Sequence, residues 1–364
     1  MNNETTILPA PKKRYEWIDN ARIVAALLIV YVHLGDLFLQ PIVHNHVADH
    51  LVHFIVYEGR VPFFLILAGY FLGRKITWHK AIDRAIWLLV PYVLWNVFYY
   101  CYFTVDHHQA FHLSGLWQAL GLYSILGLNF PGLPHEGPII WPSWFLRDIV
   151  ILSLITPLIV RFRKAVIFCL IVCLTCDFFT IPHMGGLLKA ANTCFFYFWG
   201  TCLCDFRIDD AYRILNKRFT PYVVMGLLLA IFLSLFQTLR GHTPFNATLL
   251  GGLFGALMIA QSGILIETHL PKLSKKLAPC GPACFLVFML HVPILYILTK
   301  ILPCWYIESW AIWLLPFPVA AFIIAMFLFM KKFTPWLMPY LGHMKIPKSP
   351  GAHREKDCRP VSNE

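Results

Sequence analysis

The chain has 364 residues, of which 58% are hydrophobic and only 13% are charged. Soluble domains carry about a quarter charged residues, so this composition excludes an ordinary soluble protein and favours one bundle of membrane helices. The formal net charge of +11 does not indicate nucleic-acid binding, because the basic residues lie in short loops between apolar runs.

Ten apolar segments are predicted to span a membrane, since about 20 mostly apolar residues form a helix that crosses the hydrocarbon core. The first segment is too long for the core of a cleaved signal peptide, so we expect it to remain as the first span. The segments are 18–40, 51–73, 82–103, 141–160, 164–181, 187–204, 220–239, 247–266, 280–302 and 307–330.

The order of these spans predicts three parts. They are a cytoplasmic N-terminal segment at 1–17, a transmembrane domain at 18–332 and a polar cytoplasmic tail at 333–364. The longest loop, 104–140, holds a semi-apolar stretch at 113–128 that is too short to span. We expect this stretch to lie on the membrane surface or to re-enter the membrane.

Loop charge predicts the orientation, because Lys and Arg concentrate on the cytoplasmic side of membrane proteins. With the N-terminus inside, most of the 30 Lys and Arg residues fall in inner segments, and the outer loops hold only Arg240. An odd number of spans would break this pattern. The predicted fold is therefore an all-α polytopic membrane protein with about ten transmembrane helices and both termini cytoplasmic.

Ionisable residues inside the first span are candidates for a functional site, because such groups are costly in a bilayer and usually face a polar cavity. Arg22 lies near the inner end, and His33 follows eleven residues later, about 16 Å higher on the helix. Asp36, three residues further on, could hold one tautomer of the imidazole. The alternative is that His33 only packs helices together and that Asp36 only ends the span.

The second and third spans add further charges. Glu58 and Arg60 lie in the outer half of the second span and suggest a buried polar site; the alternative is a structural ion pair at a break near Gly59 and Pro62. Basic residues at the inner ends of these spans predict a site for anionic lipid or a phosphorylated nucleotide, or else charge that only sets the topology. These residues are Arg74, Lys75, Lys80 and Arg84.

Two later segments also combine polar and aromatic residues. At the entrance of the fourth span, aromatic rings lie close in sequence to polar groups, a combination that suits sugar binding. An aromatic belt at the membrane interface explains the tryptophans equally well. The residues are His135, Glu136, Trp141, Trp144 and Arg147. In the ninth span His291 lies near mid-membrane before Pro293, whose missing N–H opens the backbone. A lone buried His is more often structural.

Cysteine spacing at 169, 173 and 176 follows one helical face. Other metal ligands are not nearby in the sequence, and apolar surroundings disfavour thiolates. We therefore expect inert thiols and no metal.

Four elements together resemble the acyltransferase-3 family of bacterial envelope membranes, which includes O-acetyltransferases of surface polysaccharides. The resemblance covers about 18 to 330. The elements are WIDNAR followed by His33, VPFFLILAGY at 61–70, WFL at 144–146, and LHVPI at 290–294.

The resemblance implies a multi-pass protein of the bacterial inner (plasma) membrane that transfers an acyl group from cytoplasmic acyl-CoA, usually acetyl-CoA, to a glycan hydroxyl outside. It assigns the presumed catalytic role to His33 and matches the family's Arg positions at Arg22 and Arg84. Two positions depart from the family pattern: Trp87 stands where the family has a second Arg, and Ala68 replaces a Ser.

The residues and the resemblance together predict a mechanism in which His33 takes the proton of the acceptor hydroxyl. Asp36 or Glu58 would orient His33, and Arg60 would stabilise the oxyanion. The CoA phosphates would bind Arg22, Arg74, Lys75 and Arg84, and the acceptor glycan would bind His135, Glu136, Trp141, Trp144, Arg147 and His291. A transient acyl-histidine is the alternative chemical route.

A carrier or flippase is the rival class, because intramembrane His, Glu and Arg also suit a proton relay or a substrate path. Against it, the sequence shows no inverted repeat and no matched pair of broken helices. The expected partners are membrane lipids, acyl-CoA and a glycan acceptor.

Overall fold

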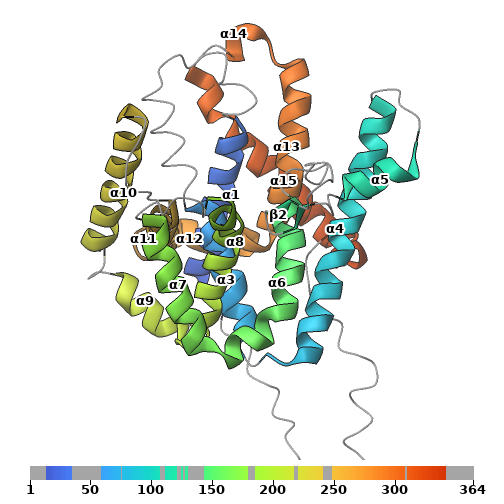
Figure 1. Ribbon diagram of the computed structural model, residues 1–364. Helices are drawn as coiled ribbons and strands as arrows, with labels where there is room; N and C mark the ends of the chain where they lie inside the picture. Colours follow the sequence, from blue (N-terminus) through green and yellow to red (C-terminus); the bar gives the residue numbers. More distant parts are fainter. Residues whose placement is uncertain are drawn as a thin grey trace, which may run out of the picture.

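The computed structural model is built almost entirely of helices (Figure 1). It describes residues 14–34, 59–74, 76–106, 111–120, 124–125, 128–129, 143–178, 185–216, 220–240, 248–307 and 310–341. Among these, the one pair of strands is β1 (Ser124–Ile125) with β2 (Leu128–Asn129), antiparallel with Ser124 opposite Asn129.

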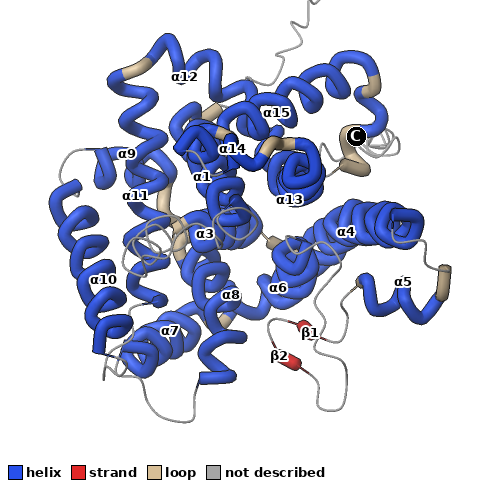
Figure 2. The backbone as a smooth tube through the Cα atoms, turned by 90° about the horizontal axis from the view of Figure 1, so that it is seen from above, coloured by secondary structure: helices blue, strands red, loops and turns tan. Residues whose placement is uncertain are grey.

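Long apolar helices make up the body of the protein, and Figure 2 shows them from above. They are α1 (Glu16–Leu34), α3 (Arg60–Gly73), α4 (Trp78–Asp106), α6 (Ser143–Arg161), α7 (Arg163–Phe178), α8 (Gly185–Cys202), α10 (Thr220–Arg240), α11 (Thr248–His269), α13 (Cys284–Ile301) and α15 (Pro316–Phe333). Shorter helices are α5 (Leu113–Ala119), α9 (Ile208–Asn216), α12 (Pro271–Leu277) and α14 (Cys304–Ile307), with 3₁₀ turns η2 (Ala278–Ala283), η3 (Trp310–Leu314) and η4 (Pro335–Leu337).

Six helical stretches of the described residues are long and apolar enough to cross a membrane, so the protein is a multi-pass membrane protein. The stretches are Glu16–Leu34, Trp78–Val105, Ser143–Arg161, Leu249–His269, Pro271–Ile301 and Ala311–Phe333. The all-helical prediction is confirmed. The number of ten spans and the cytoplasmic placement of both termini stay predictions.

Two predicted segments are informative when they are compared with the structure. Helix α3 begins at Arg60, inside the second predicted span, and the first part of that span, 51–58, lies outside the described residues. The predicted surface or re-entrant stretch at 113–128 contains the short helix α5 and part of the β1–β2 pair. Tyr100 of α4 holds the start of α5, since its hydroxyl donates a 2.8 Å hydrogen bond to the carbonyl of His112.

Helix α1 lies at the centre of the bundle and packs against α11, α13, α15 and α3. Small residues allow the closest approach: Ala21 and Ala25 of α1 are fully buried, and a Cβ on Gly263 of α11 would come within 2.2 Å of the Trp17 carbonyl. The central position of α1 matters for function because this helix carries both Arg22 and His33.

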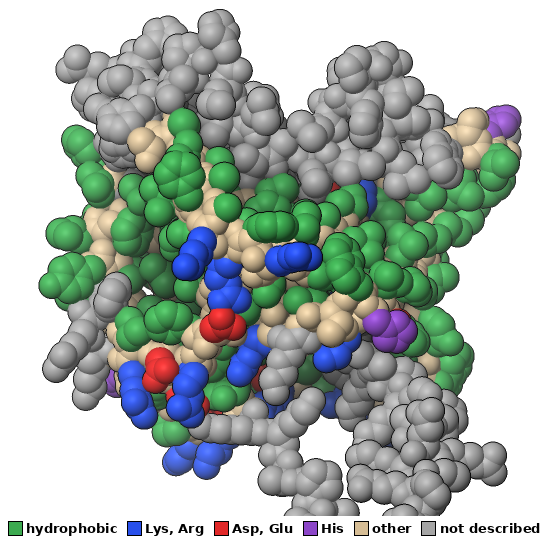
Figure 3. Space-filling view, turned by 60° about the horizontal axis from the view of Figure 1, so that its bottom comes forward, with side chains coloured by type: hydrophobic (Ala, Val, Ile, Leu, Met, Phe, Trp, Pro, Cys, Tyr) green, Lys and Arg blue, Asp and Glu red, His purple; other side chains and the backbone are tan. Residues whose placement is uncertain are grey.

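The outer surface of the bundle is apolar, whereas one end is charged. Ile86 of α4 is 54% exposed and Phe232 of α10 is 62% exposed, as expected for side chains that face lipid. Figure 3 shows Lys and Arg side chains gathered over one end of the molecule. Exposed basic residues at helix ends include Arg74, Arg161, Lys164, Arg207, Lys275 and Lys276.

Candidate active site

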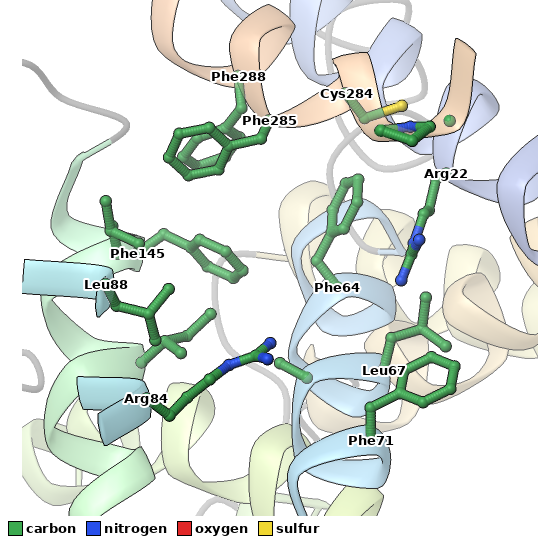
Figure 4. A pocket seen from close by; sticks show the side chains of 15 residues that line it. Arg22, Phe64, Leu67, Phe71, Arg84, Leu88, Phe145, Cys284, Phe285 and Phe288 are labelled. Carbon is green, nitrogen blue, oxygen red and sulfur yellow. The ribbon is translucent and has the colours of Figure 1, made fainter. Parts of the chain in front are cut away.

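A cavity of about 380 Å³ lies between α1, α3, α4, α6 and the start of α13 (Figure 4). Two cationic side chains line it, Arg22 from α1 and Arg84 from α4, and their guanidinium groups extend into it from opposite sides. The rest of the lining is mainly apolar, from Phe64, Leu67, Ala68, Phe71, Leu88, Phe145, Leu146, Ile149, Gly281, Pro282, Cys284, Phe285 and Phe288. Two cations in an apolar cavity are the arrangement expected of an anion-binding site.

Arg22 is held in place by Asp19, one turn earlier on α1. Its Nη1 lies 3.3 Å from Asp19 Oδ1, and the same carboxylate accepts a 2.7 Å hydrogen bond from Arg14 Nε. Asp19 is buried, and Gly281 packs against it so closely that a Cβ there would lie 2.5 Å from Oδ1. The Arg22 guanidinium is therefore oriented by a buried carboxylate and by the glycine that covers it.

Arg84 has a different environment from Arg22. Among the described residues, no ion pair or hydrogen bond to the Arg84 guanidinium is recorded. The like charge of Arg22 acts on the Arg84 guanidinium. Bringing two cations together inside a membrane helix bundle is costly unless an anion compensates them.

Aromatic rings form the cavity wall on the side of α13. The Phe145 and Phe288 ring centroids are 5.2 Å apart, and Phe64 lies 6.4 Å from Phe145. Phe288 is also 6.4 Å from the ring of His291, one helical turn further along α13. Phe288 therefore borders both the cavity and a buried histidine.

The two candidate histidines come together beyond this aromatic layer. The ring centroids of His33 and His291 are 5.0 Å apart, with 41° between the ring planes. His291 is fully buried, and its Nδ1 donates a 2.8 Å hydrogen bond to the carbonyl of Val287. Arg60, buried at the start of α3, acts electrostatically on His291. The structure thus joins His33, His291 and Arg60, which the sequence placed on three separate helices.

Other predicted residues lie away from this pair. Arg147 is buried and its Nε lies 3.0 Å from Asp148 Oδ1 within α6. Trp144 is half-buried and meets Phe145 edge-on at 6.1 Å. Arg74 is exposed at the end of α3, with its guanidinium 5.8 Å from the Tyr70 ring. Arg74 does not line the cavity that holds Arg22 and Arg84.

Several predicted site residues lie outside the described part of the chain, and their roles stay predictions. They are Asp36, Glu58, Lys75, His135, Glu136 and Trp141.

The aromatic wall and the role of Gly281 were not predicted from the sequence. Phe145, Phe285 and Phe288 look like ordinary apolar residues of a membrane helix, and only tertiary packing brings them together. A signal for Gly281 was present, because the Gly281–Pro282 dipeptide lies at the start of the ninth predicted span and marks a backbone break.

A family model described as an acyltransferase domain matches residues 15–330. The match covers most of the chain, so the protein belongs to the acyltransferase-3 family of membrane acyltransferases, as its motifs predicted. No curated protein and no solved structure matches the chain.

Proposed function

We propose that the protein is an acyl-CoA-dependent O-acyltransferase of the bacterial inner membrane, which moves an acetyl group from cytoplasmic acetyl-CoA to a hydroxyl of an extracytoplasmic glycan. One observation carries the proposal: Phe288 lines a cavity with two arginines and also lies beside His291, whose ring is paired with that of His33. An anionic donor and a transferred acyl group need such a two-part site.

The proposed topology has ten spans and both termini in the cytoplasm. Supporting it, helices occupy the predicted segments, and exposed Lys and Arg side chains gather at one end of the bundle (Figure 3). In this orientation Arg22 lies near the inner face, and His33 lies near the outer end of α1.

The donor binds with its phosphates at the arginine end of the cavity. Arg22 and Arg84 give charge-assisted hydrogen bonds to phosphate oxygens, and the bound phosphate relieves the repulsion between the two guanidinium groups. Arg74 and Lys75 attract the donor from the inner face. The pantetheine arm then occupies the apolar part of the cavity and points the thioester toward the histidine pair.

His33 acts as the general base. Neutral His33 takes the proton of the acceptor hydroxyl while that oxygen attacks the thioester carbonyl, and Arg60 stabilises the negative charge on the tetrahedral intermediate. The intermediate collapses by breaking the C–S bond. His33 returns its proton to the departing sulfur, which leaves as free CoA thiol.

The acceptor binds at the outer end of the bundle. Tryptophan rings and polar groups around the start of α6 suit a sugar ring. The proposed contacts come from His135, Glu136, Trp141, Trp144 and Arg147, with His291 behind the reacting hydroxyl. Asp36 and Glu58 lie close in sequence to the reacting end and carry the carboxylates expected there.

A direct test uses membranes that contain the protein, an extracytoplasmic glycan acceptor, and acetyl-CoA labelled in the acetyl group. The proposal expects label in base-labile ester linkage to the glycan, and free CoA released in equal amount. Label that enters the vesicles without appearing in glycan would instead identify a carrier and contradict the proposal.

A further inference from the structure

Only one ring nitrogen of His291, Nδ1, makes a hydrogen bond within its own helix, and Nε2 does not. Val287 O can only accept a hydrogen bond, so Nδ1 of His291 carries the proton of their 2.8 Å contact. A second positive charge in this fully buried position beside Arg60 would be costly, so the imidazole is neutral. Nε2 then presents a lone pair, and no described residue donates a hydrogen bond to it.

The ring of His33 lies beside the ring that carries this lone pair. The 5.0 Å separation of the ring centroids leaves room for an N–H···N hydrogen bond of about 3 Å after a small rotation of one ring. Hydrogen bonds of this kind are often long before substrate binds and tighten in the complex. The two rings come from α1 and α13, which pack directly against each other.

We propose that His291 is a positioning residue for His33. Its Nε2 accepts a hydrogen bond from one ring nitrogen of His33, which fixes the tautomer whose other nitrogen faces the acceptor hydroxyl. This inference rests on the proposed function, in which His33 is the general base. His291 performs here the orienting task that a carboxylate performs in a serine-hydrolase triad.

The hydrogen bond between His33 and His291 persists while the proton moves through the reaction. When His33 takes the hydroxyl proton, it becomes an imidazolium that still donates its first N–H to His291 Nε2. The bond becomes charge-assisted and stronger at that moment, so it favours the transition state over the ground state. His33 then gives the new proton to the departing sulfur, and both rings return to their starting tautomers.

A purely structural role for His291 makes a different prediction. In that case the important contact is the Nδ1 bond to Val287, which stabilises α13 just before Pro293. The two ring nitrogens can be separated by substitution. His291→Asn keeps an amide donor near the Nδ1 position and removes the acceptor at Nε2. His291→Gln gives up the bond to Val287 and places an amide oxygen near the Nε2 position.

The experiment measures kcat and acetyl-CoA KM for both variants in membranes, normalised to the amount of folded protein that elutes as one peak in detergent. We expect His291→Gln to keep kcat within about tenfold of the wild type, and His291→Asn to lose about 10- to 100-fold, with little change in KM. Equal kcat in the two variants, or a more active His291→Asn, would overturn the positioning role.

The same assay with His33→Ala separates this inference from the proposed function. An active His33→Ala variant would show that His33 is not the general base. That result would contradict both the proposed function and the positioning role of His291. An inactive His33→Ala together with a fully active His291→Asn would leave the function in place and remove only the positioning role of His291.

Discussion

Arg22 of α1 and Arg84 of α4 reach into the same apolar cavity from opposite sides (Figure 4). Arg22 is neutralised in part by Asp19, 3.3 Å away. Among the described residues, no carboxylate pairs with Arg84. The cavity therefore carries excess positive charge, and Arg84 is the cation that most needs an anionic ligand.

Reversal of this charge is expected to weaken donor binding. Arg84→Glu replaces the cation proposed to bind the donor phosphates by a carboxylate. The acetyl-CoA KM should therefore rise by at least about 100-fold, since one hydrogen bond to a charged group is worth about 1.5–3 kcal/mol and repulsion adds to its loss. Saturation kinetics in membranes measures this. Arg161→Glu, an exposed position outside the cavity, is the matched control. An unchanged KM for Arg84→Glu would exclude this residue from the donor site.

Donor binding should also depend on Gly281, which carries no charge. A Cβ at this position would lie 2.5 Å from Asp19 Oδ1, so Gly281→Val displaces the carboxylate that orients Arg22. The expected result is an increase in acetyl-CoA KM of about tenfold, equivalent to about 1.4 kcal/mol. Asp19→Asn should change KM in the same direction. Wild-type KM in both variants would show that the orientation of Arg22 is unimportant.

The aromatic layer is expected to limit the length of the acyl group. Phe288 packs against Phe145 and lies between the cavity and His291. Phe288→Leu should therefore raise kcat/KM for butyryl-CoA relative to acetyl-CoA by about tenfold, because each methylene accommodated in a pocket is worth about 1–3 kcal/mol. Competition between the two donors, followed by mass spectrometry of the glycan, measures the ratio. A ratio equal to that of the wild type would contradict this role.

Packing of α3 against α8 should tolerate no side chain at the crossing. A Cβ on Gly69 would lie 2.1 Å from the Tyr197 carbonyl, and a Cβ on Gly200 would lie 2.1 Å from the Ile66 carbonyl. Gly69→Val is therefore expected to cost at least about 1–3 kcal/mol and to lower the melting temperature in detergent. Phe322→Ala on the exposed face of α15 is the control, with a much smaller shift.

The membrane fold could be predicted from the sequence because its signal is local. A run of apolar residues predicts a helix by itself, and α1, α4, α6 and α11 lie close to their predicted positions. Helix ends were predicted less well. The last span was predicted from 307, whereas α15 begins at Pro316, after the 3₁₀ turn η3. At the start of α3, a Cβ on Gly59 would lie 2.4 Å from the backbone of Gly255, a close approach that hydropathy does not report.

The candidate site could be predicted only in part. Arg22 and Arg84 were expected together because both lie at inner ends of predicted spans, and they do line one cavity. The meeting of His33 with His291 could not be foreseen, since the contact depends on how α1 packs against α13. The aromatic wall could not be predicted either, because it also depends on tertiary packing. In the sequence, a phenylalanine that lines a cavity cannot be told from one that faces lipid.

The central claim is that His33 is the base in acyl transfer to an extracytoplasmic hydroxyl. Its most direct test is the rate of acetyl transfer to glycan by His33→Ala in membranes, at an amount of folded protein equal to the wild type, with His269→Ala at an exposed histidine of α11 as control. We expect a loss of about 10²–10⁴-fold for His33→Ala and no loss for the control. Wild-type acetylation by His33→Ala would contradict the account.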